Sequence, residues 1–581
     1  MAGLCACDSF FFVTAPLIVP KGWRGDPPRV TLRTSIASNG SADQVAAISV
    51  RAGSRVPALG VLLAAGLALR LGLAYVVFPG AGFSVDLGLF QGWATTLASS
   101  GPGSFYATAA TSNYPPGYLW ILWLLGSVGN VIGGALGTSG AAATASLLKL
   151  PAIAADLAIA WLVAHAAGRW FGGRAGLIAA AIYLFVPVTW YDSALWGQVD
   201  AVGALVALAA ALLLIAGWSE LALTGAVLAT LVKPQDAIVL AIVVPVLVRR
   251  HLLRIGSGPV PTFGPRLAGV DRLLRGSLGA LVRDQGPRRL ATSTVLAGVI
   301  GLAVLAPFDI QTFAPASLAD IPAIGQVAGL IGLFVRVGGE FSVLTANAYN
   351  AWALVGSTPL ASVIGSDSGS WTPDSIIVLG GLSAAAVGAG LLAGIGLLVS
   401  GGLLIRDGRL PILLGLAVLA FAFYAVPTRV HERYLVPFFA VGAILAAGSV
   451  RRVAAFIGAG VLNAINLHAV LAAPLQIGRG SGGGFGSGGG GFGGGTGGAR
   501  GIGGGFDGGP TGGGGFGSSF TSIQLPFADL ARSQLVVEAV AIGQTLLLVG
   551  LVAAWIVVLV RSPERAPAPS RLPISRAPSP G

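Results

Sequence analysis

The residues of this chain that could carry out chemistry stand in short motifs between long apolar runs. FSVDLGLFQGWA contains Asp86, and WYDSALWGQVDA contains Asp192 and Asp200. LVKPQ supplies Lys233, and TRVHERYL supplies Arg433. Charged groups near the hydrocarbon of a membrane are costly, so function is the first explanation for them. Carboxylates and basic groups gathered in one place could move a proton and bind an anion.

The composition is that of a membrane protein. Of 581 residues, 54% are hydrophobic and only 10% are charged, against about 25% charged residues in soluble domains. The net charge of +12 does not indicate nucleic-acid binding, because the bases are scattered between apolar runs and form no basic patch. Cys5 and Cys7 are the only cysteines, which excludes a disulfide framework and a cysteine-type metal site. We expect a multi-pass protein of the cell membrane.

Twelve apolar runs predict an all-α polytopic fold with about 12 transmembrane helices. They lie at residues 57–78, 147–167, 175–190, 198–217, 220–232, 236–248, 291–309, 376–400, 411–427, 435–449, 453–473 and 535–560. The short basic connections between them should stay in the cytoplasm. These connections alternate only if a further apolar stretch, 117–134, does not cross the membrane. We therefore expect a re-entrant or surface helix there, within a large first outer loop.

This topology places the polar motifs on the outer face of the membrane or at its boundary. The residues concerned are Asp86, Tyr114, Asp192, Gln198, Asp200, Lys233, Gln235, Glu340, Asn347, Asn350, Arg429, His431, Glu432 and Arg433. They come from loops far apart in the sequence, so their convergence on one side predicts a site. Asp156, in LKLPAIAADLAIA, could instead pair with a neighbouring helix.

The order of the motifs resembles the membrane-embedded glycosyltransferases of the GT-C superfamily, and within it the bacterial relatives of the GPI mannosyltransferases. The resemblance covers about residues 57–474 and depends on Asp86 followed by YPPGYLW, WGQVDA, KPQ, NAYNAW and HERYL. It implies transfer of a hexose, with mannose favoured, from a polyprenyl-phosphate sugar donor to a hydroxyl of a glycolipid, glycan or protein on the non-cytoplasmic side. Asp86 matches the position of the family's general base.

The reaction that the resemblance implies assigns roles to the bases and acids. A single general base opposite the leaving group predicts inversion at the anomeric carbon. The leaving phosphate needs cations, and the candidates are Lys233, Arg429, His431 and Arg433. Lys233 could instead extend to the membrane interface without contacting a ligand.

Sugar or acceptor contacts are expected from the acids, amides and aromatic residues of the same motifs. These residues are Tyr114, Asp192, Trp196, Gln198, Asp200, Gln235, Asn347, Asn350, Trp352 and Glu432. Asp192 and Asp200 could also orient a basic residue, hold a divalent ion or form an interfacial cap. We expect no cofactor and assert no metal, and with no second histidine near His431 a zinc site is rejected.

Segments outside the resemblance complete the predicted domain organisation. Residues 1–54 should form a disordered cytoplasmic tail, 55–474 the catalytic domain, 478–520 a Gly-rich disordered outer loop, 535–560 the last transmembrane helix, and 561–581 a Pro/Arg-rich cytoplasmic tail. The alternative function is a lipid or glycolipid transporter or flippase. Transporters often contain an internal repeat, and no convincing repeat is evident, which favours the transferase.

Overall fold

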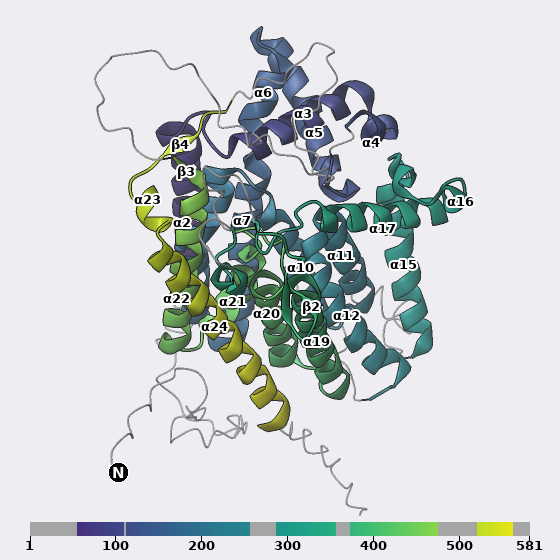
Figure 1. The fold of residues 1–581 in the computed structure, drawn as a ribbon, viewed down its shortest axis with the longest axis vertical. Coiled ribbons are helices and arrows are strands. Elements are labelled where there is room, and N and C mark those ends of the chain that lie inside the picture. The colour runs from purple at the N-terminus through teal and green to yellow at the C-terminus, as the bar shows by residue number, and fades with distance from the viewer. Residues whose placement is uncertain (1–54, 110–111, 256–285, 356–371, 474–519, 562–581) are drawn as a thin grey trace, which may run out of the picture.

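The structure is a computed structural model that describes residues 55–109, 112–255, 286–355, 372–473 and 520–561. Within these ranges the chain is almost entirely helical (Figure 1). The predicted tail 1–54 and nearly all of the Gly-rich segment and of the C-terminal tail lie outside the described residues.

The first half of the chain forms helices α2 to α12, joined by short 3₁₀ or π-helical turns. Their bounds are α2 Arg55–Leu71, η1 Gly72–Val77, α3 Ser84–Ser100, η2 Pro102–Ser104, α4 Phe105–Thr108, α5 Pro116–Leu136, α6 Gly140–Leu147, α7 Leu150–Phe171, α8 Gly173–Phe185, α9 Pro187–Trp190, η3 Tyr191–Trp196, α10 Asp200–Ile215, α11 Ser219–Val232, η4 Pro234–Val239, α12 Leu240–Leu247 and η5 Val248–Leu252.

The second half adds further helices and two small pairs of strands. Their bounds are α15 Pro287–Leu305, η7 Ile310–Phe313, α16 Ala316–Ala319, α17 Ile324–Gly339, η8 Ala351–Leu354, β1 Ile377–Leu379, β2 Leu382–Ser383, α19 Ala384–Ile405, α20 Arg409–Ala425, α21 Val436–Ala446, α22 Val450–Leu471, β3 Ala472–Ala473, β4 Ile523–Gln524, α23 Ala528–Ala531 and α24 Gln534–Arg561. β1 pairs with β2 antiparallel, and β3 pairs with β4 parallel.

Seven helices of the described chain are long and apolar enough to cross a membrane. A bent pair, Gly173–Phe185 with Pro187–Trp196, adds an eighth if it forms one span. The chain is therefore an all-α polytopic membrane protein. Each predicted run overlaps a helix, although the first residues of the run 376–400 form β1 and β2. However, α10, α11, α20 and α21 have fewer than 18 residues and α12 has only eight. The total of twelve spans stays a prediction.

The predicted runs 220–232 and 236–248 are separate in the structure, with a break at Pro234. α11 ends at Val232, and Lys233 has the extended backbone angles φ −154° and ψ 133°. Proline has no N–H to continue a helix and disfavours the helical conformation in the residue before it. The short helix η4 then begins at Pro234. This break leaves Lys233 at the end of α11, where its side chain can reach α10.

The polar motifs and the basic connections lie at opposite ends of the bundle. α10 begins at Asp200, and near its other end the carbonyl of Leu214 accepts a hydrogen bond from Arg250. The 16 residues of α10 span about 24 Å at 1.5 Å per residue. Arg406, in another basic connection, likewise donates to the carbonyl of Val558 near the end of α24.

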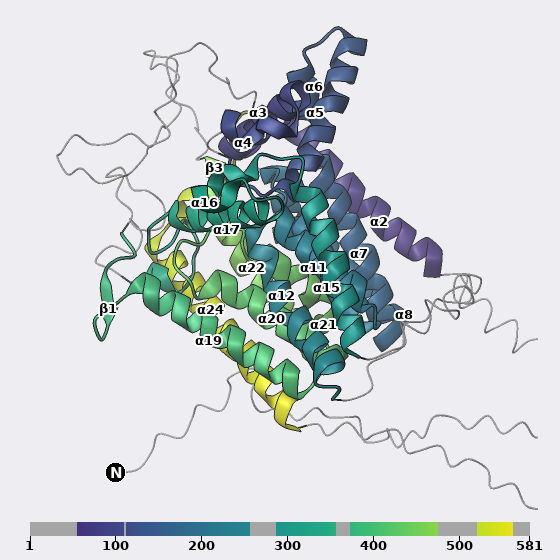
Figure 2. The same cartoon turned by 90° about the vertical axis from the view of Figure 1, so that its right-hand side faces the viewer.

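Helices α3 to α6 lie together beyond the end of the bundle that carries the polar motifs (Figures 1 and 2). The first turn of α5 packs on that end, where Trp120 donates to the carbonyl of Val304 in α15. Farther along α5, Gly129 packs directly against Thr144 of α6. α5 is long and apolar enough to span a membrane, so its predicted re-entrant or surface position stays a prediction.

Asp156 pairs with a neighbouring helix, as the simpler interpretation of its sequence context predicted. Nε of Arg70 in α2 lies 2.8 Å from Oδ2 of Asp156 in α7, and both side chains are buried. The hydroxyl of Tyr183 in α8 donates to the other carboxylate oxygen at 2.7 Å. A buried ion pair needs this full set of hydrogen bonds to offset its desolvation. Asp156 thus joins three helices and is not part of the motif cluster.

Candidate functional site

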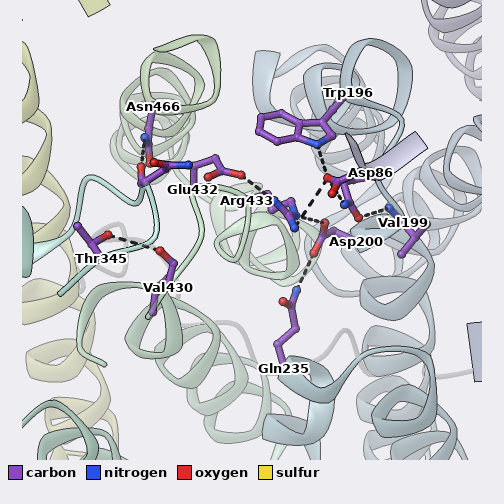
Figure 3. A network of polar contacts seen from close by, with 12 residues as sticks. Asp86, Trp196, Val199, Asp200, Gln235, Thr345, Val430, Glu432, Arg433 and Asn466 are labelled. Carbon is purple, nitrogen blue, oxygen red and sulfur yellow. Dashed lines mark hydrogen bonds and ion pairs between the residues drawn. The ribbon is translucent and has the colours of Figure 1, made fainter. Parts of the chain in front are cut away.

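Asp86 lies in the first turn of α3, with one carboxylate oxygen held and the other open. Its Oδ2 accepts hydrogen bonds from Nε1 of Trp196 at 2.8 Å and from Nε2 of Gln198 at 2.5 Å (Figure 3). Within the described chain, Oδ1 accepts no hydrogen bond, and the side chain is 15% exposed. Two donors therefore orient the carboxylate while one oxygen remains accessible.

The WGQVDA motif positions these donors through a sharp turn at Gly197. This residue has φ +87°, a conformation that glycine adopts without steric cost. The N–H groups of Gly197 and Gln198 both donate to the carbonyl of Asp192 at 3.0 Å, which closes the turn. Phe83, just before α3, stacks on Trp196 with 4.6 Å between ring centroids. The turn thus directs both donors toward the start of α3.

Asp200, at the start of α10, is held by the KPQ motif. Nζ of Lys233 and Nε2 of Gln235 both lie 2.6 Å from its Oδ1. The ammonium group also lies within 6 Å of two ring centroids, at 5.9 Å from Tyr114 and 5.6 Å from Tyr434. Lys233 is 5% exposed and Asp200 is fully buried. Lys233 therefore pairs with Asp200 inside the bundle.

Arg433 joins the two carboxylates. Its guanidinium lies 3.9 Å from Oδ2 of Asp86 and 3.9 Å from Oδ2 of Asp200, and it forms a 2.8 Å ion pair with Glu432 (Figure 3). It also lies 5.6 Å above the ring of Trp196. Close charge-assisted hydrogen bonds measure about 2.7–2.9 Å. The two longer contacts leave the cation able to bind an anion that enters beside Asp86.

The ionisation of Arg433 is favoured by its neighbours. Burial acts against the charged form, but Asp86, Glu432 and Asp200 together raise the pKa of the guanidinium well above its ordinary value. Burial also raises the pKa of Glu432, although Arg433 opposes that shift. Three carboxyl groups thus surround one guanidinium.

His431 differs from the other predicted phosphate ligands because it is neutral at pH 7. Burial and the positive charges of Arg433 and Lys233 lower its pKa well below the usual value. Its ring contacts the rings of Phe341 and Tyr434. At neutral pH this side chain therefore brings no positive charge to a phosphate.

Arg429 is bound at a different place from Arg433. Its Nε lies 2.5 Å from Oδ2 of Asp374, and its Nη1 donates to the carbonyl of Gly338. No contact between Arg429 and Asp86 or Asp200 occurs in the described part of the chain. Its predicted contact with the donor phosphate stays a prediction.

The three predicted site residues of the NAYNAW motif, which are Asn347, Asn350 and Trp352, hold a loop in place. Nδ2 of Asn350 donates to the carbonyl of Tyr424 at 3.1 Å, and Nε1 of Trp352 donates to the carbonyl of Val426 at 2.6 Å. The carbonyl of Asn347 accepts a hydrogen bond from Asn466 at 2.8 Å. These bonds fasten the loop to α20 and α22. Sequence reasoning did not identify Asn466, which lies in α22 three residues after Asn463, because the two asparagines match none of the motifs.

Tyr114 reaches the site from the loop before α5. Its hydroxyl donates to Oε1 of Gln198 at 3.2 Å, and Gln198 in turn donates to Asp86. Like Lys233 and Arg433, the predicted site residues Tyr114, Trp196, Gln198 and Gln235 therefore contact Asp86 or Asp200 directly or through one side chain.

Two further carboxylates are fully buried near this cluster. Among the described residues, both oxygens of Asp192 lack a hydrogen-bond partner, and the same holds for Asp236, which sequence reasoning missed although it follows KPQ directly. Asp236 fits against α10 because residue 203 is glycine, where a Cβ would lie only 1.8 Å from its Oδ2. Across the described ranges, no group of three or more His, Cys, Asp and Glu side chains is arranged to hold a metal ion.

A short segment after the Gly-rich region supports the loop that precedes Asp86. The N–H of Thr521 donates to the carbonyl of Gly80 at 3.0 Å, and the N–H of Gly82 donates to the carbonyl of Thr521 at 3.1 Å. Nζ of Lys149 donates to the carbonyl of Ala81 at 2.7 Å. No sequence signal pointed to Thr521, because its contribution is made by the backbone.

Comparison with known proteins gives only weak matches. No family model matches the chain, and no curated protein matches it. Two solved structures of an oligosaccharyltransferase from Archaeoglobus fulgidus are similar. One is the archaeal oligosaccharyltransferase AglB with an inhibitory peptide and a dolichol-phosphate, at TM-score 0.34 and 15% identity, and the other is the apo form, at TM-score 0.34 and 16% identity. Each match covers 70% of this chain and 50% of that structure's chain, so the chain spans about half of their length. A similarity of this size does not establish a family.

Proposed function

We propose that this chain is a membrane glycosyltransferase of the GT-C type. It would move a hexose, with mannose favoured, from a polyprenyl-phosphate sugar donor to a hydroxyl of a glycolipid, glycan or protein. The observation that supports this proposal is the arrangement of Asp86, whose Oδ2 is held by two donors and lies 3.9 Å from Arg433, while Oδ1 accepts no hydrogen bond within the described chain. The order of the sequence motifs agrees with it.

In the proposed reaction Asp86 is the general base. Its Oδ1 accepts the proton of the acceptor hydroxyl as the hydroxyl oxygen bonds to the anomeric carbon. The bond from that carbon to the phosphate oxygen breaks, and the phosphate leaves with the electron pair. Attack from the face opposite the phosphate inverts the anomeric centre. A positioned base typically contributes about 10²- to 10⁴-fold to the rate.

Arg433 is the proposed cation for the leaving phosphate. Its two 3.9 Å contacts with carboxylates can give way to shorter bonds with a phosphate. Lys233, by contrast, is already bonded to Asp200 at 2.6 Å. We therefore propose that Lys233 compensates the buried charge of Asp200. Asp200 in turn lies 3.9 Å from Arg433 and helps to position it.

The sugar would bind against the WGQVDA and KPQ motifs. Oε1 of Gln235 is buried and has no hydrogen-bond partner in the part of the chain that the structure describes, which suits a sugar hydroxyl. The ring of Tyr114 lies beside the ammonium group of Lys233 and suits a pyranose face, whereas the ring of Trp196 already packs against Phe83 and Arg433. The bonds of Asn350 and Trp352 to the backbone make these two residues weaker candidates for acceptor binding.

The site would face the non-cytoplasmic side of the membrane. Support comes from Arg250 and Arg406, which lie at the end of the bundle opposite the site, because basic connections favour the cytoplasm.

The test is to incubate the purified protein with labelled polyprenyl-phosphate mannose and a membrane lipid extract, and to identify the labelled product. Transfer of label to a lipid, glycan or protein supports the proposal. Movement of the labelled lipid across the bilayer without sugar transfer would favour the alternative, a lipid or glycolipid flippase.

A further inference from the structure

Helix α17 is packed on one face and uncovered on the other. On the packed face, Gly329 and Gly332 lie against the backbone of η7. A Cβ at these positions would lie 2.2 Å from the carbonyl oxygen of Ile310 and 2.1 Å from that of Phe313. Only residues without a side chain allow this approach, so the orientation of α17 about its axis is fixed.

The opposite face of α17 is a continuous aliphatic stripe. Ile324, Val327, Ile331 and Val335 are 51%, 45%, 58% and 72% exposed. Their spacing of three or four residues places them on one side of the helix. Four large aliphatic side chains in water would be unfavourable by the hydrophobic effect.

The position of α17 indicates what covers this stripe. The helix lies across the end of α15, which is long and apolar enough to cross a membrane (Figure 1). Nε2 of Gln326 lies 3.5 Å from the carbonyl of Ala306, the residue after α15. With 16 residues, α17 is shorter than the roughly 20 residues that a span needs. A one-sided apolar helix at the level where a span ends suits the membrane interface.

We infer that α17 is an in-plane membrane helix, seated in the lipid monolayer nearest the site with its aliphatic stripe among the acyl chains. The occupant of the stripe is thus the lipid surface itself. This inference does not depend on the reaction that the protein catalyses.

A second consequence of this seating does rest on the proposed function. At the C-terminal end of α17, Nη2 of Arg336 donates to the carbonyl of Ser112 at 2.5 Å. Next to α17, Glu340 accepts a hydrogen bond from Asn113 at 3.0 Å. These bonds hold the residues directly before Tyr114, whose hydroxyl reaches Gln198. α17 would therefore hold Tyr114 at a fixed height above the acyl chains, which suits a substrate whose reacting group is attached to a lipid.

The seating can be measured by spin labelling of the full chain in vesicles of phosphatidylcholine and phosphatidylglycerol. Cys5 and Cys7 are replaced by serine, and a single cysteine carries a nitroxide at position 331 or, separately, 335. Collisions with oxygen, which concentrates in acyl chains, are compared with collisions with a water-soluble nickel chelate. Val299, 60% exposed on α15, gives the lipid reference, and the exposed Asp320 gives the water reference.

We expect the nitroxides at positions 331 and 335 to collide preferentially with oxygen, as a nitroxide at Val299 does. Chelate preference, as at Asp320, would overturn the inference. Protection from both reagents would overturn it too, because another protein chain or a second copy would then cover the stripe.

A paired substitution separates this inference from the proposed function. Val327→Asp with Ile331→Asp should lower the oxygen preference at position 335 at least several-fold, whereas Val327→Leu with Ile331→Leu should preserve it. An unchanged oxygen preference in the aspartate variant would count against the seating, whether or not the protein transfers sugar. If the seating holds and no sugar transfer is found with any variant, only the proposed function fails.

Discussion

Nε1 of Trp196 donates a 2.8 Å hydrogen bond to Oδ2 of Asp86, although the two residues are 110 positions apart. Gln198, two residues farther on, donates to the same oxygen. The turn between Trp196 and α10 therefore fixes how the carboxylate of Asp86 points, and the accessible Oδ1 follows from that orientation.

Replacing Trp196 by phenylalanine should slow the reaction without unfolding the protein. The variant keeps an aromatic ring for stacking on Phe83 but loses the N–H that orients Asp86. A hydrogen bond to a charged group is worth about 1.5–3 kcal/mol, so we expect kcat to fall about 10-fold or more. Steady-state kinetics of sugar transfer measure the effect. Trp123→Phe, on the exposed side of α5, is the matched control. Equal kcat in the two variants would contradict this role of Trp196.

Lys233→Met should destabilise the protein because it removes the nearest counter-charge of the buried Asp200 and leaves only Arg433, at 3.9 Å. Breaking a buried ion pair by removing one partner costs about 3–5 kcal/mol. The double variant Lys233→Met with Asp200→Asn should recover most of this loss, since no uncompensated charge remains. Thermal unfolding of the purified proteins in nanodiscs compares the parent, Lys233→Met, Asp200→Asn and the double variant. A double variant as unstable as the sum of the single variants would show that the two residues are not coupled.

Thr521→Pro should loosen the loop before Asp86. Proline removes the N–H that bonds to the carbonyl of Gly80 and constrains the backbone that accepts from Gly82. We expect faster hydrogen exchange of the Gly82 amide and slower sugar transfer. Thr521→Val keeps the backbone bonds and should behave like the parent protein. If the hydrogen-exchange rate of the Gly82 amide is unchanged in the proline variant, the segment around Thr521 does not support the loop before Asp86.

Stability should decrease as the pH falls below about 6.5, partly because of His431. Unfolded histidine takes up a proton near pH 6.5, whereas burial and the charges of Arg433 and Lys233 lower the pKa of folded His431 well below that value. In this window the unfolded state binds more protons, so the free energy of unfolding decreases with decreasing pH. The contribution is fully present above pH 6.5.

Thermal unfolding of the parent protein and of His431→Gln between pH 7.5 and 5.5 measures this effect. The other histidines are common to both proteins, so their contribution cancels in the comparison. The variant should lose less stability over the range. An equal loss in both proteins would assign the pH dependence to other groups.

The sequence predicted the helices better than it predicted the contacts. Apolar run length and the proline at position 234 were sufficient to locate the break after α11, because both act locally. Apolar run length did not determine the number of membrane spans, since α10 and α11 are apolar but short.

The site was predictable where a motif carries several polar side chains. WGQVDA and KPQ supply the groups that bind Asp86 and Asp200. Arg429 and Arg433 are only four residues apart, yet one pairs with Asp374 and the other with Glu432. Arg429 has φ +67°, and nothing in the motif specifies that turn. Asp236 and Thr521 were missed because their surroundings are set by tertiary packing.

The central proposal is that Asp86 is the base of a sugar transfer, and Asp86→Asn tests it most directly. The amide can still accept hydrogen bonds from Trp196 and Gln198 through its oxygen, but it cannot take the proton. With labelled polyprenyl-phosphate mannose and the identified acceptor, the initial rate should fall about 10²- to 10⁴-fold, while Asp320→Asn, at the exposed end of α16, keeps the parent rate. A rate of Asp86→Asn equal to that of the parent protein would contradict the proposal.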